Sequence, residues 1–274
     1  MAVAAAVGHS TVRWPWRYRT RQLVWAVIDL VFPPQCAGCG RAGQRFCSDC
    51  QQSLEELKAP FCEDCGYPVA QAGRCPACSL SLQRFTALAG LRSAAFHTGS
   101  LRKAILQLKY HHDGILADSL ATRLLAAGPD EAPAGCLVVP VPLSAERLAA
   151  RGYNQAELLA RAYAELSGLR CAPRAARRVR DTETQVGLSP RQRRLNVANA
   201  FGAERRLAGG QPIILVDDVC TTGATLDSCA AALLEAGAAQ VWGLTLARAR
   251  QPGARGDEKH REAGAAAGQA GAVL

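Results

Sequence analysis

After residue 85, short continuous runs of aliphatic residues alternate with stretches whose apolar positions recur at helical spacing. The aliphatic runs lack polar alternation, which is typical of strands buried on both faces of a parallel sheet. We expect one or two short strands within 86–96, strands at 137–139, 212–219 and 241–247, and helices at 101–108, 115–127, 154–167 and 224–236. This alternation of strands and helices predicts an α/β domain with a parallel sheet. A basic stretch at 174–194 follows neither period and is expected to be an irregular loop.

The pattern divides the chain into four parts. Residues 1–32 form a basic segment that ends in an apolar stretch at 23–32, which we interpret as a short helix or, alternatively, as a membrane-surface element. Residues 33–82 are rich in cysteine and contain no long apolar run. The α/β domain is expected to cover 83–250, and the alanine- and glycine-rich residues 251–274 are expected to form a disordered tail.

Eight of the twelve cysteines lie in the second part as four Cys-x-x-Cys pairs. The pairs are Cys36 with Cys39, Cys47 with Cys50, Cys62 with Cys65, and Cys75 with Cys78. One such turn points two thiolates at a single position and supplies half of a tetrahedral zinc site. Disulfides are the alternative, but they need an oxidising compartment that nothing else in the sequence indicates. The pairs therefore predict one or two structural zinc ions, and the spacing leaves both sequential and cross-brace pairing open.

The segment 213–226 carries the most specific candidate chemistry. It runs from an aliphatic strand through Asp217 and Asp218 into a turn that consists of Thr221, Thr222, Gly223, Ala224 and Thr225. Ligands bind at the carboxyl ends of parallel strands, and the N–H groups of a helix N-terminus bind anions. A phosphate beside a vicinal diol would fit this turn and these two acids. A capped helix alone explains the threonines, but it does not explain two adjacent carboxylates, which repel each other.

The balance of charges narrows the class of partner. The chain has 274 residues, of which 49% are hydrophobic, and its 32 basic and 23 acidic residues give a formal net charge of +9. Only four of the basic residues are lysines, and the guanidinium fork of arginine suits the paired oxygens of phosphate groups. We therefore expect an anionic partner, although arginine and alanine richness is also typical of GC-rich coding.

Targeting signals are not recognised in the sequence. No uninterrupted apolar stretch is long enough for a transmembrane helix, and the first residues do not follow the pattern of a secretory signal. We therefore expect a cytoplasmic protein.

The segment 213–226 resembles the 5-phosphoribosyl-1-pyrophosphate (PRPP) loop of type I phosphoribosyltransferases. Further segments resemble the ComF family of bacterial competence proteins, and together the resemblance covers residues 33–249. The segments that resemble the ComF family are Leu108-Lys109-Tyr110 with Asp113, Val139-Pro140-Val141-Pro142, Arg151-Gly152-Tyr153-Asn154-Gln155-Ala156, Thr184-Gln185 with Leu188, and Arg194 with residues 196–201. That family joins a double zinc ribbon to a type I phosphoribosyltransferase-like domain.

The resemblance implies a set of site residues. Asp217 and Asp218 would bind the ribose hydroxyls of PRPP, and residues 221–225 would bind its 5-phosphate. The candidates for binding pyrophosphate or another anion are Arg147, Arg151, Arg191 and Arg194. Cys220, at a position that is variable in the family, is assigned no chemistry.

Two functions follow from the resemblance. The first is Mg²⁺-dependent phosphoribosyl transfer from PRPP to an unspecified nitrogenous acceptor, linked to DNA uptake in natural transformation. The second is a non-catalytic competence factor that holds single-stranded DNA with its phosphate site and basic loop, in contact with DNA-uptake proteins. No general base is identified in the sequence.

Overall fold

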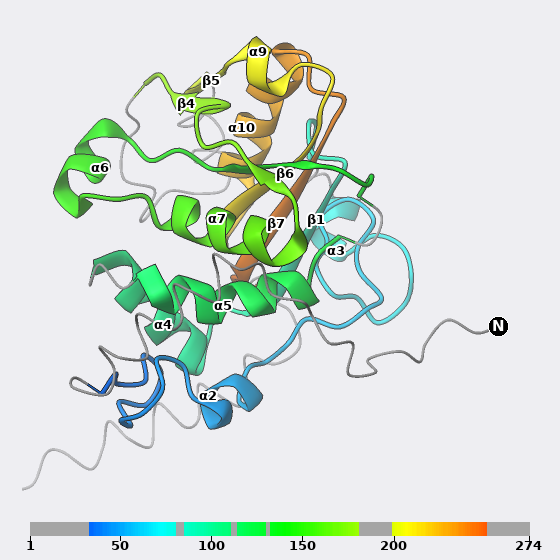
Figure 1. The fold of residues 1–274 in the computed structure, drawn as a ribbon. Coiled ribbons are helices and arrows are strands. Elements are labelled where there is room, and N and C mark those ends of the chain that lie inside the picture. The colour runs from blue at the N-terminus through cyan, green and yellow to red at the C-terminus, as the bar shows by residue number, and fades with distance from the viewer. Residues whose placement is uncertain (1–32, 81–84, 111–113, 130–131, 181–198, 251–274) are drawn as a thin grey trace, which may run out of the picture.

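A five-stranded parallel sheet forms the centre of the larger domain (Figure 1). The computed structural model describes residues 33–80, 85–110, 114–129, 132–180 and 199–250. The strands, in spatial order, are β1 (Gly90–Phe96), β7 (Gln240–Arg248), β6 (Pro212–Cys220), β2 (Leu137–Pro140) and β3 (Arg170–Cys171). All neighbouring strands pair in parallel, as the apolar runs predict.

Helices cover both faces of this sheet, so that alternate residues of each strand enter different cores. On one face, Ile214 and Val216 pack with α4 (Gly99–Tyr110), α5 (Gly114–Ala126) and α7 (Gln155–Ser167). On the other face, Ile213 and Leu215 pack with α10 (Ala224–Glu235). Burial on both faces explains why these strands contain no polar alternation.

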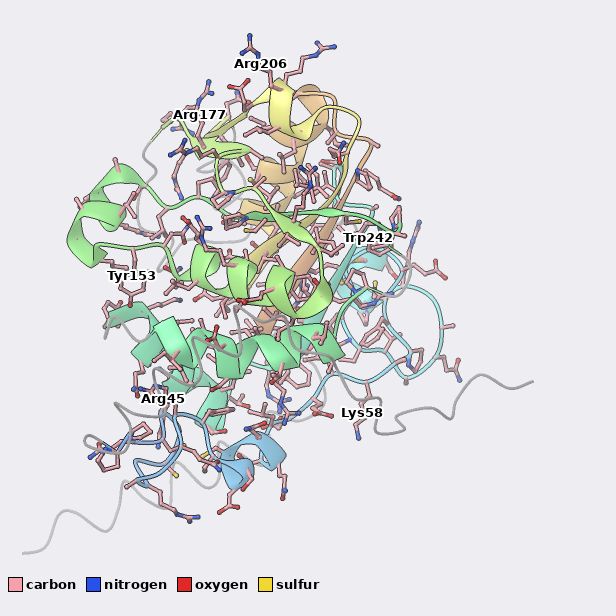
Figure 2. All side chains as sticks on the ribbon, viewed as in Figure 1. Arg45, Lys58, Tyr153, Arg177, Arg206 and Trp242 are labelled. Carbon is pink, nitrogen blue, oxygen red and sulfur yellow. The ribbon has the colours of Figure 1, made fainter. Side chains whose placement is uncertain are left out.

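Two short antiparallel strands lie beside α10. They are β4 (Ala176–Arg178) and β5 (Phe201–Ala203), followed by the short helix α9 (Arg205–Ala208). The expectation of an irregular loop from residue 174 is therefore wrong for its first part, because Ala176 is buried and the backbone pairs with β5. Figure 2 shows Arg177 and Arg206 extending outward at this end of the molecule.

Two small cysteine-rich units lie on the α/β domain at different places. The unit with α2 (Ser48–Gln52) contacts the start of α4, where the hydroxyl of Ser100 donates to the carbonyl of Cys50 at 3.0 Å. The unit with α3 (Pro76–Ser79) lies beside β1, where the rings of Tyr67 and Phe96 meet edge to face with centroids 5.8 Å apart. Figure 1 shows this separation of α2 from α3.

Other expectations have mixed outcomes. The stretch 86–96 contains a single strand, because residues 85–89 form a linker that is held by other contacts. The helix α6 (Ala145–Arg151) was not anticipated from the pattern, because it contains no buried residue. The expected helix at 23–32 and tail at 251–274 lie outside the described residues.

Candidate functional site

A cavity of about 470 Å³ lies at the carboxyl ends of β1, β2 and β6. This is the edge of a parallel sheet where ligands bind. The cavity is lined by residues that follow the strands, by the ends of helices and by β4. Its polar lining residues are His97, Lys109, Arg147, Arg151, Gln155, Arg178, Asp217, Asp218, Thr221 and Thr225.

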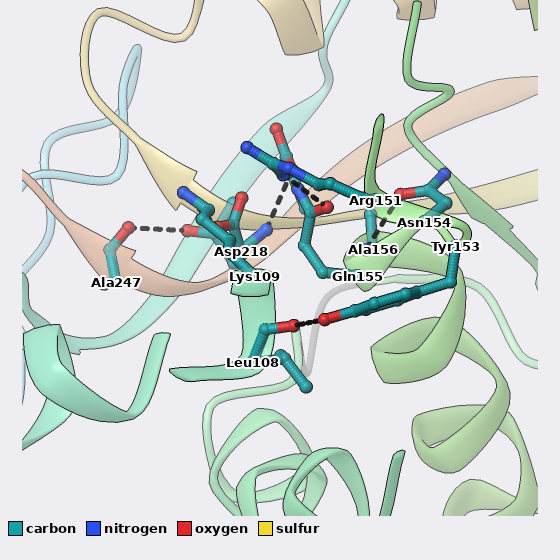
Figure 3. A network of polar contacts seen from close by, with 11 residues as sticks. Leu108, Lys109, Arg151, Tyr153, Asn154, Gln155, Ala156, Asp218 and Ala247 are labelled. Carbon is teal, nitrogen blue, oxygen red and sulfur yellow. Dashed lines mark hydrogen bonds and ion pairs between the residues drawn. The ribbon is translucent and has the colours of Figure 1, made fainter. Parts of the chain in front are cut away.

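The two acids at the end of β6 have different partners. The Asp218 carboxylate is buried, and its Oδ2 lies 2.6 Å from the Nζ of Lys109, the penultimate residue of α4. The Asp217 Oδ1 accepts the backbone N–H of Asp218 at 2.8 Å. Figure 3 shows Lys109 and Asp218 close to Gln155, whose Oε1 accepts a hydrogen bond from Arg151 Nη1 at 2.9 Å. Through Gln155, these contacts connect Asp218 to Arg151 across the cavity.

This arrangement separates the pKa values of the two acids. Burial and the negative charge of Asp218 together raise the pKa of Asp217 well above its ordinary value. Burial acts in the same direction on Asp218, but the Lys109 ammonium and the hydrogen bonds from Lys109 and Gln155 outweigh it, so the pKa of Asp218 is lowered. The Lys109 contact therefore favours the ionised form of Asp218, whereas burial and the charge of Asp218 favour the protonated form of Asp217. Such a pair both accepts and donates hydrogen bonds, which suits a diol.

The turn after β6 has the geometry of an anion site. Gly223 has a φ of +80° and directly precedes α10, whose twelve residues begin with Ala224. Thr222 is buried and its Oγ1 accepts the N–H of Ala224 at 3.4 Å. A β-carbon on Gly223 would lie 2.3 Å from the Phe85 ring, so this position requires glycine for space as well as for its φ. The turn places the N-terminus of α10 at the cavity, where Thr221, Gly223 and Thr225 contribute to the lining.

Two of the four predicted anion-binding arginines line the cavity. The helix α6 is capped at its N-terminus by Ser144, whose Oγ accepts the N–H of Arg147 at 3.3 Å, and at its C-terminus by Gly152, which has a φ of +75°. This short helix places Arg147 and Arg151 at the cavity wall, where Arg151 also lies over the Tyr110 ring at 5.3 Å. The other two candidates, Arg191 and Arg194, lie outside the described residues.

Four further polar residues line the cavity but had no role in the sequence prediction. They are His97, Lys109, Gln155 and Arg178. Lys109 and Gln155 occur in the segments that resemble the ComF family, which was the only available signal for them. Burial, aided by the charge of Lys109, lowers the pKa of His97, which favours its neutral imidazole.

The eight cysteines of the four pairs form two separate clusters. One consists of Cys36, Cys39, Cys47 and Cys50, the other of Cys62, Cys65, Cys75 and Cys78, and the sulfurs of each lie within 4.8 Å of one another. This settles the pairing as sequential rather than cross-brace.

The clusters fit tetrahedral zinc. A site with zinc–sulfur distances of about 2.3 Å has sulfur–sulfur edges of about 3.8 Å. The Cys39–Cys47 and Cys65–Cys75 sulfurs are each 3.7 Å apart. Backbone N–H groups donate to the sulfur of Cys36 and, although burial opposes this effect, they lower its pKa to about 6. Four sulfurs complete each coordination shell, so both sites suit structural zinc.

Comparison with known proteins finds several relatives that match most of the chain, of which three follow. DNA utilization protein YhgH of Salmonella typhi is 35% identical over 208 residues, which are 72% of this chain and 88% of that protein. Competence protein F of Haemophilus influenzae is 31% identical over 215 residues, covering 74% and 90%. Competence protein ComFC of Bacillus subtilis is 28% identical over 236 residues, covering 84% and 91%. Residues 27–79 match the family model of the double zinc ribbon domain.

Solved structures give weaker similarities. Glutamine PRPP amidotransferase from B. subtilis is 20% identical with a TM-score of 0.35, covering 50% of this chain and 30% of that chain. Hypoxanthine phosphoribosyl transferase of Trypanosoma cruzi is 14% identical with a TM-score of 0.29, covering 57% and 69%. Among the residues that the structure describes, no helix has the length and apolar character needed to cross a membrane.

Proposed function

Because this chain belongs to the ComF family of competence and DNA utilization proteins, we propose that its cavity binds PRPP in a role linked to DNA uptake. The observation that carries the proposal is the convergence of three kinds of group in one cavity. The carboxylates of Asp217 and Asp218, the turn before α10, and Arg147 with Arg151 lie around the same 470 Å³ space. A diol, a phosphate and a pyrophosphate are the three groups of PRPP.

Each group of the ligand has a matching part of the site. The 5-phosphate would accept hydrogen bonds from the N–H groups of the turn at 221–225, and the ribose hydroxyls would meet the two acids. The pyrophosphate would lie at Arg147 and Arg151, whose planar forks bind paired oxygens. The cavity offers carboxylate oxygens, the donor type that Mg²⁺ prefers, and a bound Mg²⁺ would neutralise charge on the pyrophosphate.

As an enzyme, the protein would transfer the 5-phosphoribosyl group to a nitrogenous acceptor with loss of pyrophosphate. The Arg147 and Arg151 side chains would stabilise the charge that develops on this leaving group. Asp218, held ionised by Lys109, would keep the ribose hydroxyls oriented during transfer. The zinc clusters require reduced thiols, so we place this function in the cytoplasm.

Dissecting the ligand into fragments tests the proposal. Thermal stabilisation would be measured with ribose 5-phosphate, with pyrophosphate and Mg²⁺, and with PRPP and Mg²⁺. The double variant Asp217→Asn/Asp218→Asn is expected to lose the response to ribose 5-phosphate and keep that to pyrophosphate. The double variant Arg147→Gln/Arg151→Gln should keep the response to ribose 5-phosphate and lose that to pyrophosphate. Arg206→Gln, outside the cavity, serves as the matched arginine control, and no response of wild type to PRPP would refute the proposal.

A second candidate function, the binding of single-stranded DNA, is favoured by a second groove. This groove of about 870 Å³ is lined by Arg161, Arg170, Arg174 and Arg206 and by one acid, Glu157. Glu157 pairs with Arg161, whereas the other three arginines form no ion pair with any residue that the structure describes. The segment 170–178 reaches from this groove to Arg178 in the PRPP cavity. Phosphodiester groups could therefore follow a path of arginines between the two sites.

Charge reversal distinguishes this function from PRPP binding. In fluorescence anisotropy with labelled single-stranded DNA, Arg170→Glu/Arg206→Glu should weaken binding. Affinity falls with salt, and the plot of log affinity against log salt concentration should become less steep by about 0.7 for each lost phosphate contact. The response to PRPP should stay unchanged. Equal DNA binding by the variant and wild type at every salt concentration would exclude the groove.

A further inference from the structure

Arg248 is the last residue of β7 and is completely buried. It lies between the second cysteine cluster, which consists of Cys62, Cys65, Cys75 and Cys78, and the turn at 221–225, which we call the phosphate turn. Its Nη1 donates to the sulfur of Cys220 at 2.7 Å, and its guanidinium carbon lies 5.9 Å from the centre of the Tyr67 ring. Its Nε and Nη2 are buried without a hydrogen-bond partner among the described residues. A buried cation with so few partners is strongly unfavourable unless negative charge lies nearby.

The second cysteine cluster is a source of that negative charge. Four thiolates around one Zn²⁺ leave a net charge of two negative units on the site, by simple addition of formal charges. Tyr67, whose ring lies 5.9 Å from the guanidinium carbon, packs with these four cysteines, and its carbonyl accepts the N–H of Cys62 at 2.7 Å, so Arg248 lies beside the cluster. With zinc bound, Arg248 faces a fixed anion. Removal of zinc removes this fixed zinc–thiolate charge beside the guanidinium.

On its other side, Arg248 holds the residue from which the phosphate turn begins. Cys220 pairs with Arg248 in the β6–β7 register, and its carbonyl accepts the N–H of Ala249 at 2.9 Å. The turn starts at the next residue, Thr221. A displacement of the guanidinium would therefore release the Cys220 side chain at the base of the ligand site.

The linker after the second cluster makes two more contacts with the same turn. Phe85 packs against the second cluster and against the domain core, and its ring covers Gly223. Asp227, in the first turn of α10, accepts hydrogen bonds from the backbone N–H groups of Thr86 and Ala87 at 3.0 and 2.9 Å. The first cluster, in contrast, contacts the start of α4 through Ser100.

We propose that Arg248 is a positioning residue that makes ligand binding at the phosphate turn depend on zinc in the second cysteine cluster. The inference rests on the proposed function in that its ligand is PRPP. The coupling between zinc and the phosphate turn, however, is a property of the protein without ligand. It can therefore be measured whether or not PRPP binds.

The test compares Arg248→Met with Arg41→Met, which removes an arginine beside the first cluster instead. Arg41 is paired with Asp49 at the surface near Cys39 and Cys47, and its side chain is 68% exposed. Zinc release to a colorimetric chelator, hydrogen–deuterium exchange of residues 220–226 without ligand, and PRPP affinity by calorimetry would be measured for both. Arg248→Lys keeps the charge without the fork and provides a second variant if Arg248→Met does not fold.

For Arg248→Met we expect one of the two zinc equivalents to be released about tenfold faster, a typical effect of removing an outer partner of a metal site. Exchange in 220–226 should rise and PRPP affinity should fall by a similar factor, with intermediate values for Arg248→Lys and wild-type values for Arg41→Met. Unchanged zinc release and exchange in Arg248→Met and Arg248→Lys would overturn the inference. Absence of PRPP binding by zinc-loaded wild type would instead refute the proposed function, and zinc release and exchange would still decide the role of Arg248.

Discussion

Replacement of Lys109 by methionine tests the electrostatic structure of the site. The Lys109 and Asp218 side chains are 22% and 6% exposed, and their charged atoms lie 2.6 Å apart. Coulomb's law with an effective dielectric constant of about 20 gives an attraction of about 6 kcal/mol at this distance. Desolvation offsets part of it, and loss of one partner from a buried pair costs about 3 kcal/mol. We expect Lys109→Met to lower the free energy of unfolding by about this amount.

The assay is a double-mutant cycle at several pH values. Urea unfolding of wild type, Lys109→Met, Asp218→Asn and the double variant gives the coupling energy of the pair. Because Lys109 lowers the pKa of Asp218, the pair stabilises the fold above the unfolded pKa of about 3.9. This stabilisation is lost as the pH falls through the lower, folded pKa. The stability deficit of Lys109→Met should therefore be largest near neutral pH and shrink in acid.

Two results would refute this reasoning. A coupling energy below about 0.5 kcal/mol would mean that the two residues act independently. A deficit that is the same in acid as at neutral pH would mean that Lys109 contributes through packing of its aliphatic stem rather than through its charge. Lys103→Met, on the exposed face of the same helix, controls for the general effect of removing a lysine.

Three further predictions concern other parts of the molecule. Asp217→Asn should raise the free energy of unfolding at neutral pH, because the raised pKa of Asp217 makes the wild type less stable as the pH rises above about 4. Urea unfolding at acidic and neutral pH should show that the variant has lost this decrease of stability with pH. Gly223→Ala should lower the melting temperature more than Gly210→Ala, because both positions have positive φ but only Gly223 faces the Phe85 ring. Equal decreases of the melting temperature would contradict the proposed crowding. Native mass spectrometry should find two zinc ions per chain, and their removal should unfold residues 33–80, seen as faster hydrogen exchange there. A single ion at full loading would contradict the assignment of two sites.

The sequence was sufficient for four of the five strands of the parallel sheet and for its principal helices, but no strand was predicted at β3. The runs at 137–139 and 212–219 are continuous and aliphatic, and such runs have few alternatives to a buried strand. The acids at the end of the second run and the turn that follows could be placed for the same reason. The three-residue strand β4 could not be predicted, because two of its residues are arginines and its pairing with β5 comes from tertiary context.

The partners of the site residues were beyond the sequence because they come from distant elements. Lys109 meets Asp218 only when α4 packs against the sheet, and Arg248 is buried only when the second cysteine unit covers the end of β7. The spacing of the cysteines also allowed two ways of pairing. The first pair joins the second and the third pair joins the fourth, and the folded backbone was needed to show it.

The most direct test of PRPP binding is a calorimetric titration of PRPP with Mg²⁺ into the zinc-loaded protein and into Asp217→Asn/Asp218→Asn. We predict micromolar binding by the wild type and no measurable heat of binding by the variant, with both proteins folded by circular dichroism. A wild type that does not bind PRPP, or a variant that binds it equally well, would contradict the assignment of the β6 acids and the α10 turn as a ribose-phosphate site.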